Sequence, residues 1–426
     1  MLDIKFIRAQ PDVVRAAAQL KRIEFDVDRL LEVDAERRRL LQQVEELKAQ
    51  QNRTSKEIAT LQGEARSARI QAMQALVARI KELTETQRVV DESFESLQLL
   101  VPNIPAAEVP PGKDESENVE VRRWGTPRQF DFEPRDHVAL GLDLDLVDFE
   151  RAAKLAGSRT YFLKGNGALL ELAVLRFALD HIVARGFTPM LVPLLVRPLA
   201  MIGTAYYPGG EEQAYQVERD GVSLIGTAEV PITAFHAHEI LEEEALPRLY
   251  AGWSPCFRRE AGTYGRDTRG LYRIHQFQKI EQVVVCRADA AESLRWHQTI
   301  LQNSEELLQQ LELPYRVVNV CGGDLGRPQV QKFDLETWMP SRNGYGETHS
   351  ASRFHDFQAR RLDLRYRDAQ GKVQFCHTLN NTVIASPRIL IAILENNQQA
   401  DGSVILPTAL RPYMGGTERL ERKSGD

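Results

Sequence analysis

Apolar residues in the N-terminal quarter of the chain recur at alternating steps of three and four residues. This heptad spacing is typical of long α-helices that pack along one apolar face. A polar stretch at 62–72, which includes Gly63, separates two such series. The pattern predicts an antiparallel pair of helices, each roughly 45 Å long at about 1.5 Å per residue. The first series consists of Leu30, Val33, Arg37, Leu40, Val44, Leu47, Gln51, Thr54, Ile58 and Leu61, and the second of Met73, Leu76, Ile80, Leu83, Gln87, Val90, Phe94, Leu97 and Val101.

The rest of the chain has a mixed pattern. The interval 102–124 contains four prolines and several acidic residues, and it is expected to be a linker. Beyond it, short apolar runs alternate with helical patterns, which predicts an α+β fold with helices packed on an antiparallel sheet. The expected parts are a helical arm at 1–101 with its coiled coil from about residue 27, the linker, a mixed domain at 125–416 and a polar tail at 417–426. Helices are expected at 169–185, 289–311 and 389–398, and strands at 221–230, 315–320, 333–338 and 362–367.

Two further strands, Trp253–Glu260 and Leu271–Val285, are predicted on either side of a polar loop. Side chains alternate between the faces of a strand, so residues two apart share a face. One shared face would carry cations, an aromatic ring and carboxylates, a combination that suits a nucleotide. An exposed hairpin with a charged face explains the same pattern. The residues concerned are Arg258 and Glu260 on the first strand, and Arg273, His275, Phe277, Lys279 and Glu281 on the second.

The composition of the chain argues against several classes of protein. Hydrophobic residues make up 43% of the 426 positions, enough for a large core, and no apolar run reaches the about eighteen residues of a membrane span. The N-terminus has no signal-peptide core, and the four cysteines are far apart, so neither a zinc site nor a disulfide framework is expected. A reducing cytoplasm is therefore the expected location. The net charge of −6 does not support nucleic-acid binding by bulk charge, although local patches decide phosphate contact.

Neither a dinucleotide-binding GxGxxG nor a P-loop occurs. Instead, the stretches FRREAG, GRDTRGL and HQFQKIE resemble motif 2 of the class II aminoacyl-tRNA synthetases in its seryl-tRNA synthetase form. The resemblance implies that Arg258 contacts the α-phosphate and the substrate carboxylate. It also implies that Glu260 lies on the adenine side, where Phe277 stacks on the base, and that Glu281 accepts a hydrogen bond from the substrate hydroxyl. The loop 263–269 would approach the tRNA acceptor end. The implied ATP-binding set further includes Arg259, Ile274, His275 and Gln276.

The stretch TAEVP places Thr227 and Glu229 two residues apart. A glutamate there could hold an ammonium group, and a threonine hydroxyl could add a second contact. Capping of the following helix explains the same triplet. In the family that the chain resembles, TAEVP is the serine-binding segment, which implies Thr227, Ala228 and Glu229 as serine-binding residues.

The stretch GETHSASRF offers hard oxygen ligands, which suit magnesium rather than zinc. A strand end followed by a capped helix explains it as well. The resemblance implies that Glu347, Thr348, His349 and Ser350 lie at ATP and that Glu347 and Ser350 bind its Mg²⁺. Ala351 stands where cysteine is usual in the family, at a position to which no chemistry is assigned.

The stretches HTLNNT and PRI resemble motif 3. The resemblance implies that Asn380 and Thr382 frame the amino-acid pocket and that Arg388 holds the γ-phosphate. Arg258 and Arg388 would then be the catalytic pair. A buried arginine at a helix start, paired to a carboxylate, is the structural alternative.

The apolar run Gly186–Pro193 is similar to motif 1, whose strand lies at the family's dimer interface, so a buried strand and a homodimer are expected. The stretch LENNQQADGSVILPTALRPYMGG resembles the family's C-terminal signature. In the family the helical arm lies against the long variable arm of tRNA. A dimerisation coiled coil or a plain scaffold is the alternative for the arm.

The resemblance implies a cytoplasmic ligase that uses ATP as substrate with Mg²⁺ and without zinc, and that joins L-serine to tRNA(Ser). Whether tRNA(Sec) is also charged is left open. Two other functions stay open as well. One is an amino-acid-activating relative that loads a carrier protein or small molecule, which would be expected to lack the arm. The other is a coiled-coil scaffold that carries an inactive synthetase domain, although every charged residue named above is present.

Overall fold

The computed structural model describes residues 1–262 and 269–422, and its chain forms two compact units. The first unit comprises Met1–Gln19 and Ile23–Pro102, and the second comprises Leu20–Arg22 and the chain from Asn103 onward. Most of the loop expected near the tRNA acceptor end, residues 263–268, lies outside the described residues. Among the helices that are described, none combines the length and apolarity needed to cross a bilayer.

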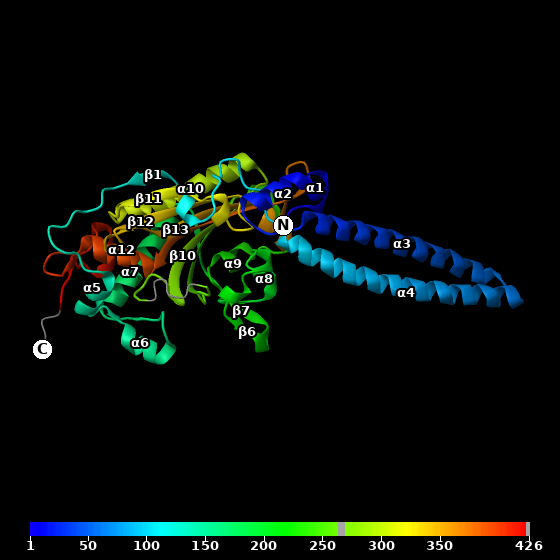
Figure 1. Ribbon diagram of the computed structural model, residues 1–426, viewed down its shortest axis with the longest axis horizontal. Helices are drawn as coiled ribbons and strands as arrows, with labels where there is room; N and C mark the ends of the chain where they lie inside the picture. Colours follow the sequence, from blue (N-terminus) through cyan, green and yellow to red (C-terminus); the bar gives the residue numbers. More distant parts are fainter. Residues whose placement is uncertain (263–268, 423–426) are drawn as a thin grey trace. The chain divides into compact units, whose positions relative to one another are not determined.

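The first unit contains the expected antiparallel pair of long helices, α3 (Val27–Thr60) and α4 (Gly63–Leu100), which run side by side in Figure 1. Their 34 and 38 residues correspond to about 51 and 57 Å. Leu40, Val44 and Leu83 from the two predicted seams form a buried cluster between the helices. The heptad pattern therefore predicted both the pairing and the buried face.

The connection between these helices is shorter than expected. Only Leu61 and Gln62 lie between them, because α4 already begins at Gly63. The polar stretch 62–72 is thus almost wholly helical. Its Glu, Ala, Arg and Gln residues are good helix formers, so their polarity reflects exposure to solvent and does not mark a break.

The helices α1 (Ile4–Ala9) and α2 (Pro11–Leu20) precede the long pair. Asp34 on α3 is buried and accepts two hydrogen bonds of 2.6 Å from the guanidinium of Arg8 on α1. A buried carboxylate needs such a partner, so this ion pair fixes α1 to α3.

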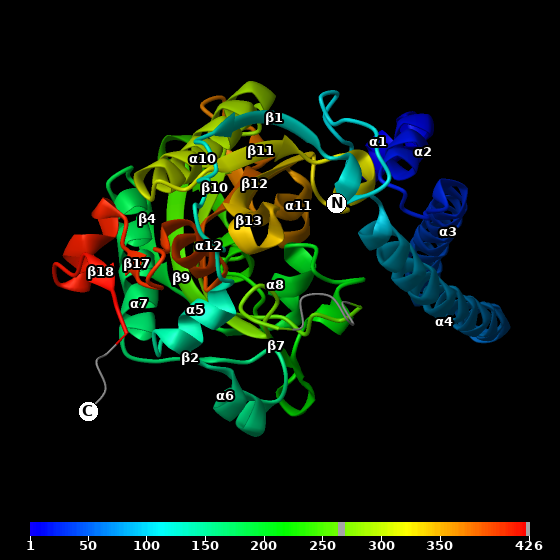
Figure 2. The same ribbon diagram turned by 60° about the vertical axis from the view of Figure 1, so that its left-hand side comes forward.

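The second unit is built on a sheet whose described strands number eight, in the order β1-β11-β12-β13-β16-β10-β9-β4 (Figure 2). Neighbouring strands are antiparallel except β4 and β9, which are parallel. The sheet and its helices confirm the predicted α+β fold. The strands are β1 (Val119–Trp124), β4 (Thr188–Leu191), β9 (Arg248–Phe257), β10 (Gln276–Cys286), β11 (Tyr315–Asn319), β12 (Gln331–Met339), β13 (Gly344–His355) and β16 (His377–Ser386), and the main helices are α7 (Asn166–Val183), α10 (Ala290–Gln310) and α12 (Arg388–Asn397).

The central strand β10 has two environments. Ile280 and Val284 belong to the main hydrophobic core, together with residues of α7 and α10. Phe277, Lys279 and Glu281 lie on the opposite face and line a cavity. The alternation predicted for this strand therefore separates the core from the functional face.

The alternation does not extend as far as the sequence predicted. Arg258, Glu260, Arg273 and His275 were expected on the strands, but β9 ends before the first two and β10 begins after the last two. Glu260 has a left-handed backbone with φ of 53°, which ends the extended conformation. Tertiary contacts, and not strand geometry, therefore orient these four side chains.

The interval 102–124, expected to be a linker, contributes a strand to the sheet at its end. Its last six residues form β1, which pairs with β11 at the edge of the sheet. Asn319 on β11 also donates a hydrogen bond of 2.8 Å to the carbonyl oxygen of Glu108. Prolines and acidic residues in this interval therefore mark a segment that packs on the sheet.

Two expected strands are shorter than predicted. The segment 221–230 contains only the short strand β7 before a helix, and the segment 362–367 contains the end of a helix before the short strand β14. The remaining described elements are α5 (His137–Asp143), α6 (Phe149–Ala156), α8 (Pro198–Gly203), α9 (Glu229–Thr233), α11 (Phe357–Leu362), β2 (Val147–Asp148), β3 (Phe162–Leu163), β5 (Leu195–Val196), β6 (Gln216–Val217), β7 (Val222–Leu224), β8 (Ile240–Glu242), β14 (Arg365–Arg367), β15 (Val373–Phe375), β17 (Val404–Ile405), β18 (Arg419–Leu420), and short 3₁₀ turns between them.

Candidate active site

A cavity of about 470 Å³ lies over the face of the sheet formed by β10, β13 and β16, and the first residue of α12 contributes to its wall. Most residues that the sequence proposed for a site meet in this cavity, although they come from five separate segments. These residues are Glu229, Arg258, Glu260, Ile274, Phe277, Glu281, Glu347, Thr348, His349, Ser350, Asn380, Thr382 and Arg388.

Glu229 is the first residue of α9, and its carboxylate is 8% exposed. It accepts hydrogen bonds from the hydroxyl of Tyr206 at 3.2 Å and from Nε2 of Gln358 at 2.9 Å. Burial and the negative charge of Glu281 raise the pKa of Glu229 to about 7. An ammonium group in the cavity would supply the compensating positive charge, so this end of the cavity is suited to an amine.

Thr227 and Ala228 precede α9 and are buried without lining the cavity. The Thr227 hydroxyl accepts a hydrogen bond of 3.2 Å from the backbone N–H of Glu229. This contact is a local threonine turn just before the helix, whose N-cap residue is Ala228, and it holds the glutamate that does face the cavity.

Glu281 on β10 lies directly opposite Thr382 on β16. The Thr382 hydroxyl donates a hydrogen bond of 3.3 Å to the Glu281 carboxylate, and Lys279 forms an ion pair with the same carboxylate. All three side chains are buried, and Asn380 lines the wall beside them. Because a carboxylate offers about four lone pairs, Glu281 can accept a further hydrogen bond from a hydroxyl in the cavity.

Arg258 lies next to an aromatic ring. Its guanidinium carbon is 5.2 Å from the centre of the Phe277 ring, and its Nε donates a hydrogen bond of 3.3 Å to the carbonyl oxygen of Gly226. Glu260 also lines the cavity and pairs with Arg273 at 3.4 Å. A permanent cation beside a ring is a suitable setting for a phosphate and its base.

Three other residues of the predicted nucleotide set do not line the cavity. Arg259 and Gln276 are exposed, and His275 is half-buried with its Nδ1 3.0 Å from the carbonyl oxygen of Arg258. The backbone N–H of Arg258 also donates to the carbonyl oxygen of His275 at 2.9 Å. His275 therefore supports the backbone that carries Arg258.

Glu347 and Ser350 are three residues apart on β13, a spacing that would put them on opposite faces of a regular strand. A β-bulge at Thr348, where β13 has one residue more than β12, brings both side chains to the cavity. Burial would raise the pKa of Glu347, but the charges of Lys332 and Arg388, together with other arginines, lower it. The site thus presents an ionised carboxylate and a hydroxyl on one face.

Arg388 occupies the first position of α12. Its guanidinium donates to the carbonyl oxygen of Glu347 at 2.8 Å and to that of Tyr272 at 3.2 and 3.3 Å, and it lies 4.3 Å from the centre of the Tyr272 ring. The Glu347 carboxylate is 3.7 Å away. Arg388 therefore has the contacts of a structural arginine at a helix start and also lines the cavity.

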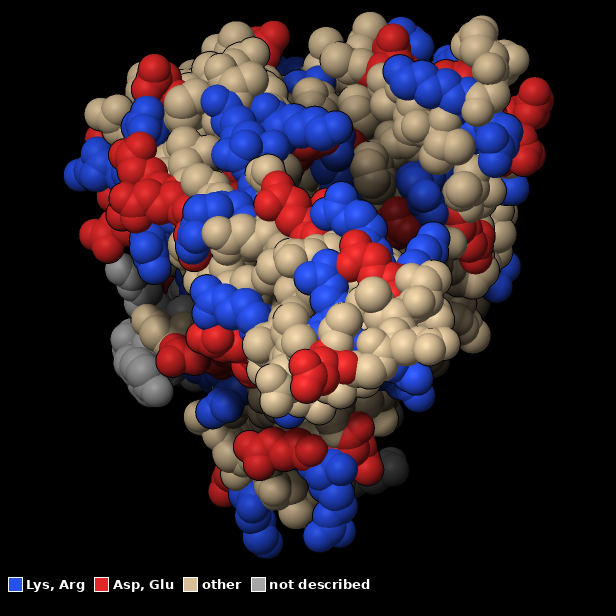
Figure 3. Space-filling model, turned by 90° about the vertical axis from the view of Figure 1, so that its right-hand side faces the viewer, with Lys and Arg blue, Asp and Glu red and all other residues tan. Residues whose placement is uncertain are grey.

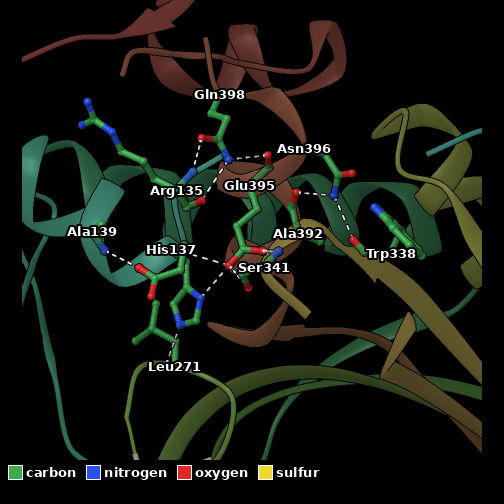
Figure 4. Close-up of polar contacts among 11 residues, drawn as sticks. Arg135, His137, Ala139, Leu271, Trp338, Ser341, Ala392, Glu395, Asn396 and Gln398 are labelled. Carbon is green, nitrogen blue, oxygen red and sulfur yellow. Dashed lines mark hydrogen bonds and ion pairs between the residues drawn. The ribbon is translucent and has the colours of Figure 1, made fainter. Parts of the chain in front are cut away.

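A buried network fixes the segment that leads to Tyr272 (Figure 4). The Glu395 carboxylate on α12 is 0% exposed and lies 2.8 Å from both the Nδ1 of His137 and the hydroxyl of Ser341. Nε2 of His137 accepts a hydrogen bond of 3.2 Å from the backbone N–H of Leu271. Since Nε2 accepts, Nδ1 donates to Glu395. The helix that begins with Arg388 thereby also holds the chain next to Tyr272.

Sequence reasoning did not assign Tyr206, Gln358, Tyr272 or Lys332 to the site, although all but Gln358 line the cavity. Gln358 reaches the cavity through its contact with Glu229. Tyr206 and Lys332 lie away from the stretches that carried a motif, and Tyr272 and Gln358 lie just beyond such stretches without a pattern that singles them out. Nothing in the local pattern could have found them.

Two family models match parts of the chain, and related proteins match nearly all of it. Residues 215–397 match the tRNA synthetase class II core domain (G, H, P, S and T), and residues 1–105 match the seryl-tRNA synthetase N-terminal domain. The serine–tRNA ligase of Deinococcus radiodurans is 50% identical over 99% of both chains. That of Symbiobacterium thermophilum is 46% identical over 99% of this chain and 100% of its own.

Solved structures give the same picture. The seryl-tRNA synthetase from Pyrococcus horikoshii, complexed with ATP, is 40% identical with a TM-score of 0.92 and covers 99% of this chain and 100% of its own. The cytoplasmic serine–tRNA ligase from Naegleria fowleri, in complex with AMP, is 32% identical with a TM-score of 0.87 over 100% of this chain and 99% of its own. With this fold, this cavity and relatives matched from end to end, the chain belongs to the seryl-tRNA synthetase family.

Proposed function

We propose that the chain activates L-serine with ATP and transfers the serine to tRNA(Ser). In the first step the serine carboxylate attacks the α-phosphate of ATP, which gives seryl-adenylate and releases pyrophosphate. In the second step the 2′- or 3′-hydroxyl of the terminal tRNA adenosine attacks the seryl carbonyl and releases AMP. Such chemistry depends on positioning and charge neutralisation more than on a protein nucleophile.

One observation carries the proposal: groups complementary to each part of serine line one cavity. Glu229 suits the ammonium, the Glu281–Thr382 pair suits the hydroxyl, and Arg258 suits the carboxylate and the α-phosphate. Arg388 adds a second cation for the outer phosphates. The names of the relatives, and the ATP and AMP bound in two related structures, support the same substrates.

Glu347 and Ser350 would hold Mg²⁺. A carboxylate and a hydroxyl on one face are oxygen ligands of the type that Mg²⁺ accepts. Among the described residues, no group of three or more His, Cys, Asp or Glu is placed to hold a metal ion, so the protein itself would supply only these two ligands. Mg²⁺ usually takes the rest of its ligands from water and substrate phosphates, so two protein ligands are sufficient. When bound, the ion neutralises phosphate charge.

The serine KM in ATP–pyrophosphate exchange is expected to rise as the pH falls below about 7, because the pKa of Glu229 in the free protein is about 7. The raised pKa means that the group is already protonated at a pH where an ordinary glutamate is ionised, and a neutral carboxyl does not hold an ammonium. At one pH unit below the pKa about a tenth of the group is ionised, so the serine KM should rise about tenfold. A Glu229→Gln variant should have a high serine KM at every pH. A serine KM that stays constant between about pH 6 and 8 would contradict the role of Glu229.

A homodimer is proposed through the edge strand β4 and its surroundings. In the single chain this strand is mostly exposed, and Leu191 is 85% exposed, so the expected burial would have to come from a partner. Leu169 and Leu172 on α7 are exposed by 53% and 54%. An unpaired edge with large apolar side chains is suited to association. Sedimentation equilibrium tests this, with twice the chain mass of 48.3 kDa as the expected result and the single mass as the contrary one.

The long helix pair is proposed to bind the body of the tRNA. A loader of small molecules would not need it, and residues 1–105 match an N-terminal domain of this family. Lys and Arg alternate with Asp and Glu along α3 and α4, several of them in ion pairs such as Arg39–Glu36 and Arg88–Glu85. On the face of the protein drawn in Figure 3, side chains of both charges are likewise interspersed. Such a surface is suited to a few phosphate contacts and a shallow dependence on salt, with recognition of shape more than of bases.

Shortening the arm should reduce tRNA charging without reducing serine activation. Val44 and Leu83 belong to one buried cluster, so removing residues 46–81 and closing the pair with a short glycine turn keeps the Arg8–Asp34 and Arg37–Asp91 ion pairs. Serine-dependent exchange should stay within about twofold of the parent. The kcat/KM for tRNA charging should fall at least about 100-fold, which corresponds to about 2.8 kcal/mol.

The matched control for this deletion is the double substitution Arg53→Ala and Lys56→Ala. It keeps the helix pair and changes only its charge, so it should weaken tRNA charging only a few-fold. Both proteins should melt cooperatively. A shortened protein that charges tRNA as well as the parent would show that the arm is a scaffold.

A further inference from the structure

A short turn, Gly326–Gln329, forms part of the cavity wall in front of β12. Gly326, Pro328 and Gln329 all line the cavity. The backbone N–H of Gln329 donates to the carbonyl oxygen of Gly326 at 3.2 Å, and the Gln329 side-chain oxygen accepts from the N–H of Gly326 at 2.7 Å. These local bonds shape the turn, but they leave the carbonyl groups of the other residues to be bound from elsewhere.

Lys21 binds the turn from one side. It follows α2, and with Leu20 and Arg22 it belongs to the same compact unit as the sheet. Its side chain is buried, and Nζ donates to the carbonyl oxygens of Gly326, Arg327 and Gln329 at 3.1, 2.9 and 2.6 Å. An ammonium has three N–H donors, so three backbone carbonyls of one turn use all of them. Burying the charged ammonium group of a lysine is costly unless its N–H donors are bound. The three carbonyl groups must therefore stay in place around Nζ.

Asn103, which follows the arm in the sequence, binds the same turn. Its backbone N–H donates to the carbonyl oxygen of Arg327 at 2.9 Å. Its side-chain Nδ2 donates to the carbonyl oxygens of Pro328 and Phe354 at 2.9 and 2.8 Å. Phe354 also lines the cavity. The four consecutive carbonyls of the turn are thus bound by two residues, one shortly before α3 and one shortly after α4.

Hydrogen bonds also connect the Gly326–Gln329 turn to the proposed serine end of the cavity. Nε2 of Gln329 donates to the hydroxyl of Ser352 at 2.8 Å, and Ser352 on β13 lies opposite Asn380 on β16. The Arg327 guanidinium donates to the carbonyl oxygen of Pro208 at 2.8 Å, two residues beyond the tyrosine that binds Glu229. Both sides of the turn therefore support the wall around the amino-acid site.

We propose that Lys21 and Asn103 are positioning residues for serine binding. They fix the Gly326–Gln329 turn, and they link the chain segments that enter and leave the arm to the wall of the serine site. The inference rests on the proposed function and adds two residues that support the affinity for serine without touching it. Neither residue contacts the reacting atoms, so their effect should be on serine binding and not on the chemical step.

The test measures ATP–pyrophosphate exchange by the full chain with Lys21→Met and Asn103→Asp. The second variant keeps the side-chain shape and removes both Nδ2 donor contacts. Each variant should raise the serine KM about tenfold or more, the effect of losing about 1.4 kcal/mol, while kcat and the ATP KM stay within about twofold of the parent. Should Lys21→Met fail to fold, Lys21→Gln, which keeps two N–H donors, takes its place.

The matched control is Asn118→Ala. Asn118 also links the chain to the segment before β12, through Asp324 at 2.9 Å and the N–H of Cys321 at 2.9 Å, but it does not contact the turn. It should lower the melting temperature without changing the serine KM. An unchanged serine KM in the folded Lys21 and Asn103 variants, or an equal rise with Asn118→Ala, would overturn the inference. Absence of serine exchange in the parent would instead contradict the proposed function.

Discussion

Replacing either Arg258 or Arg388 by alanine is expected to reduce serine-dependent ATP–pyrophosphate exchange by about 10²–10³-fold, the loss found when one preorganised donor to a developing charge is removed. Both guanidiniums line the cavity, and no P-loop is present to bind phosphates. The charge that builds up on the α- and γ-phosphates would be left without its cation. The effect should be on kcat/KM for ATP.

The conservative variants make this prediction sharper. Arg258→Lys keeps the charge but loses the planar set of donors, and it should recover only part of the activity. Arg123→Ala serves as the control, because Arg123 is an exposed arginine on β1 that pairs with Glu120 away from the cavity. Circular dichroism should show an intact fold in all of them. An Arg388→Ala protein that activates serine at the parental rate would show that the contacts of Arg388 with Glu347 and Tyr272 are structural only.

Alanine is expected to fail as a substrate, with exchange about 10⁴-fold below that of serine. A site built to hydrogen-bond a hydroxyl rejects the analogue that lacks it, because the buried polar groups of the site are left unpaired. Here the groups are the carboxylate of Glu281, which is 2% exposed, and its partners Lys279 and Thr382. Threonine should be hindered by its additional methyl group. The measurement is exchange with each amino acid at matched concentrations.

Glu281→Ala should raise the serine KM and reduce the preference for serine over alanine. Alanine would leave the buried Lys279 ammonium without any acceptor at this position, so Glu281→Gln, which removes the charge but keeps the shape and an acceptor oxygen, is the better-folded comparison. Thr382→Ser should behave like the parent, because it keeps the hydroxyl that donates to Glu281. Equal exchange with serine and alanine by the parent protein would contradict the assignment of the amino acid.

Local patterns predicted the elements whose structure is set by their own residues. The heptad series predicted α3 and α4, because an apolar stripe along one helix needs only a partner with a matching stripe. The helix expected at 289–311 is α10, and Asp289 caps its start by accepting a hydrogen bond of 2.6 Å from the N–H of Glu292. Patterns were less successful at boundaries, where Glu260 leaves the strand conformation and where β1 joins the sheet.

The sequence by itself determined the fold class, the arm and most cavity residues, the last through motifs that resemble a known family. Only the tertiary structure decided which residues support them. The bulge at Thr348 puts Glu347 and Ser350 on one face. The alternation of residues along a strand does not reveal such an extra residue. Lys21 and Asn103 bind a turn more than 200 positions away in the sequence. Such contacts depend on which elements meet in space, and the periodicity of a segment describes only its own faces.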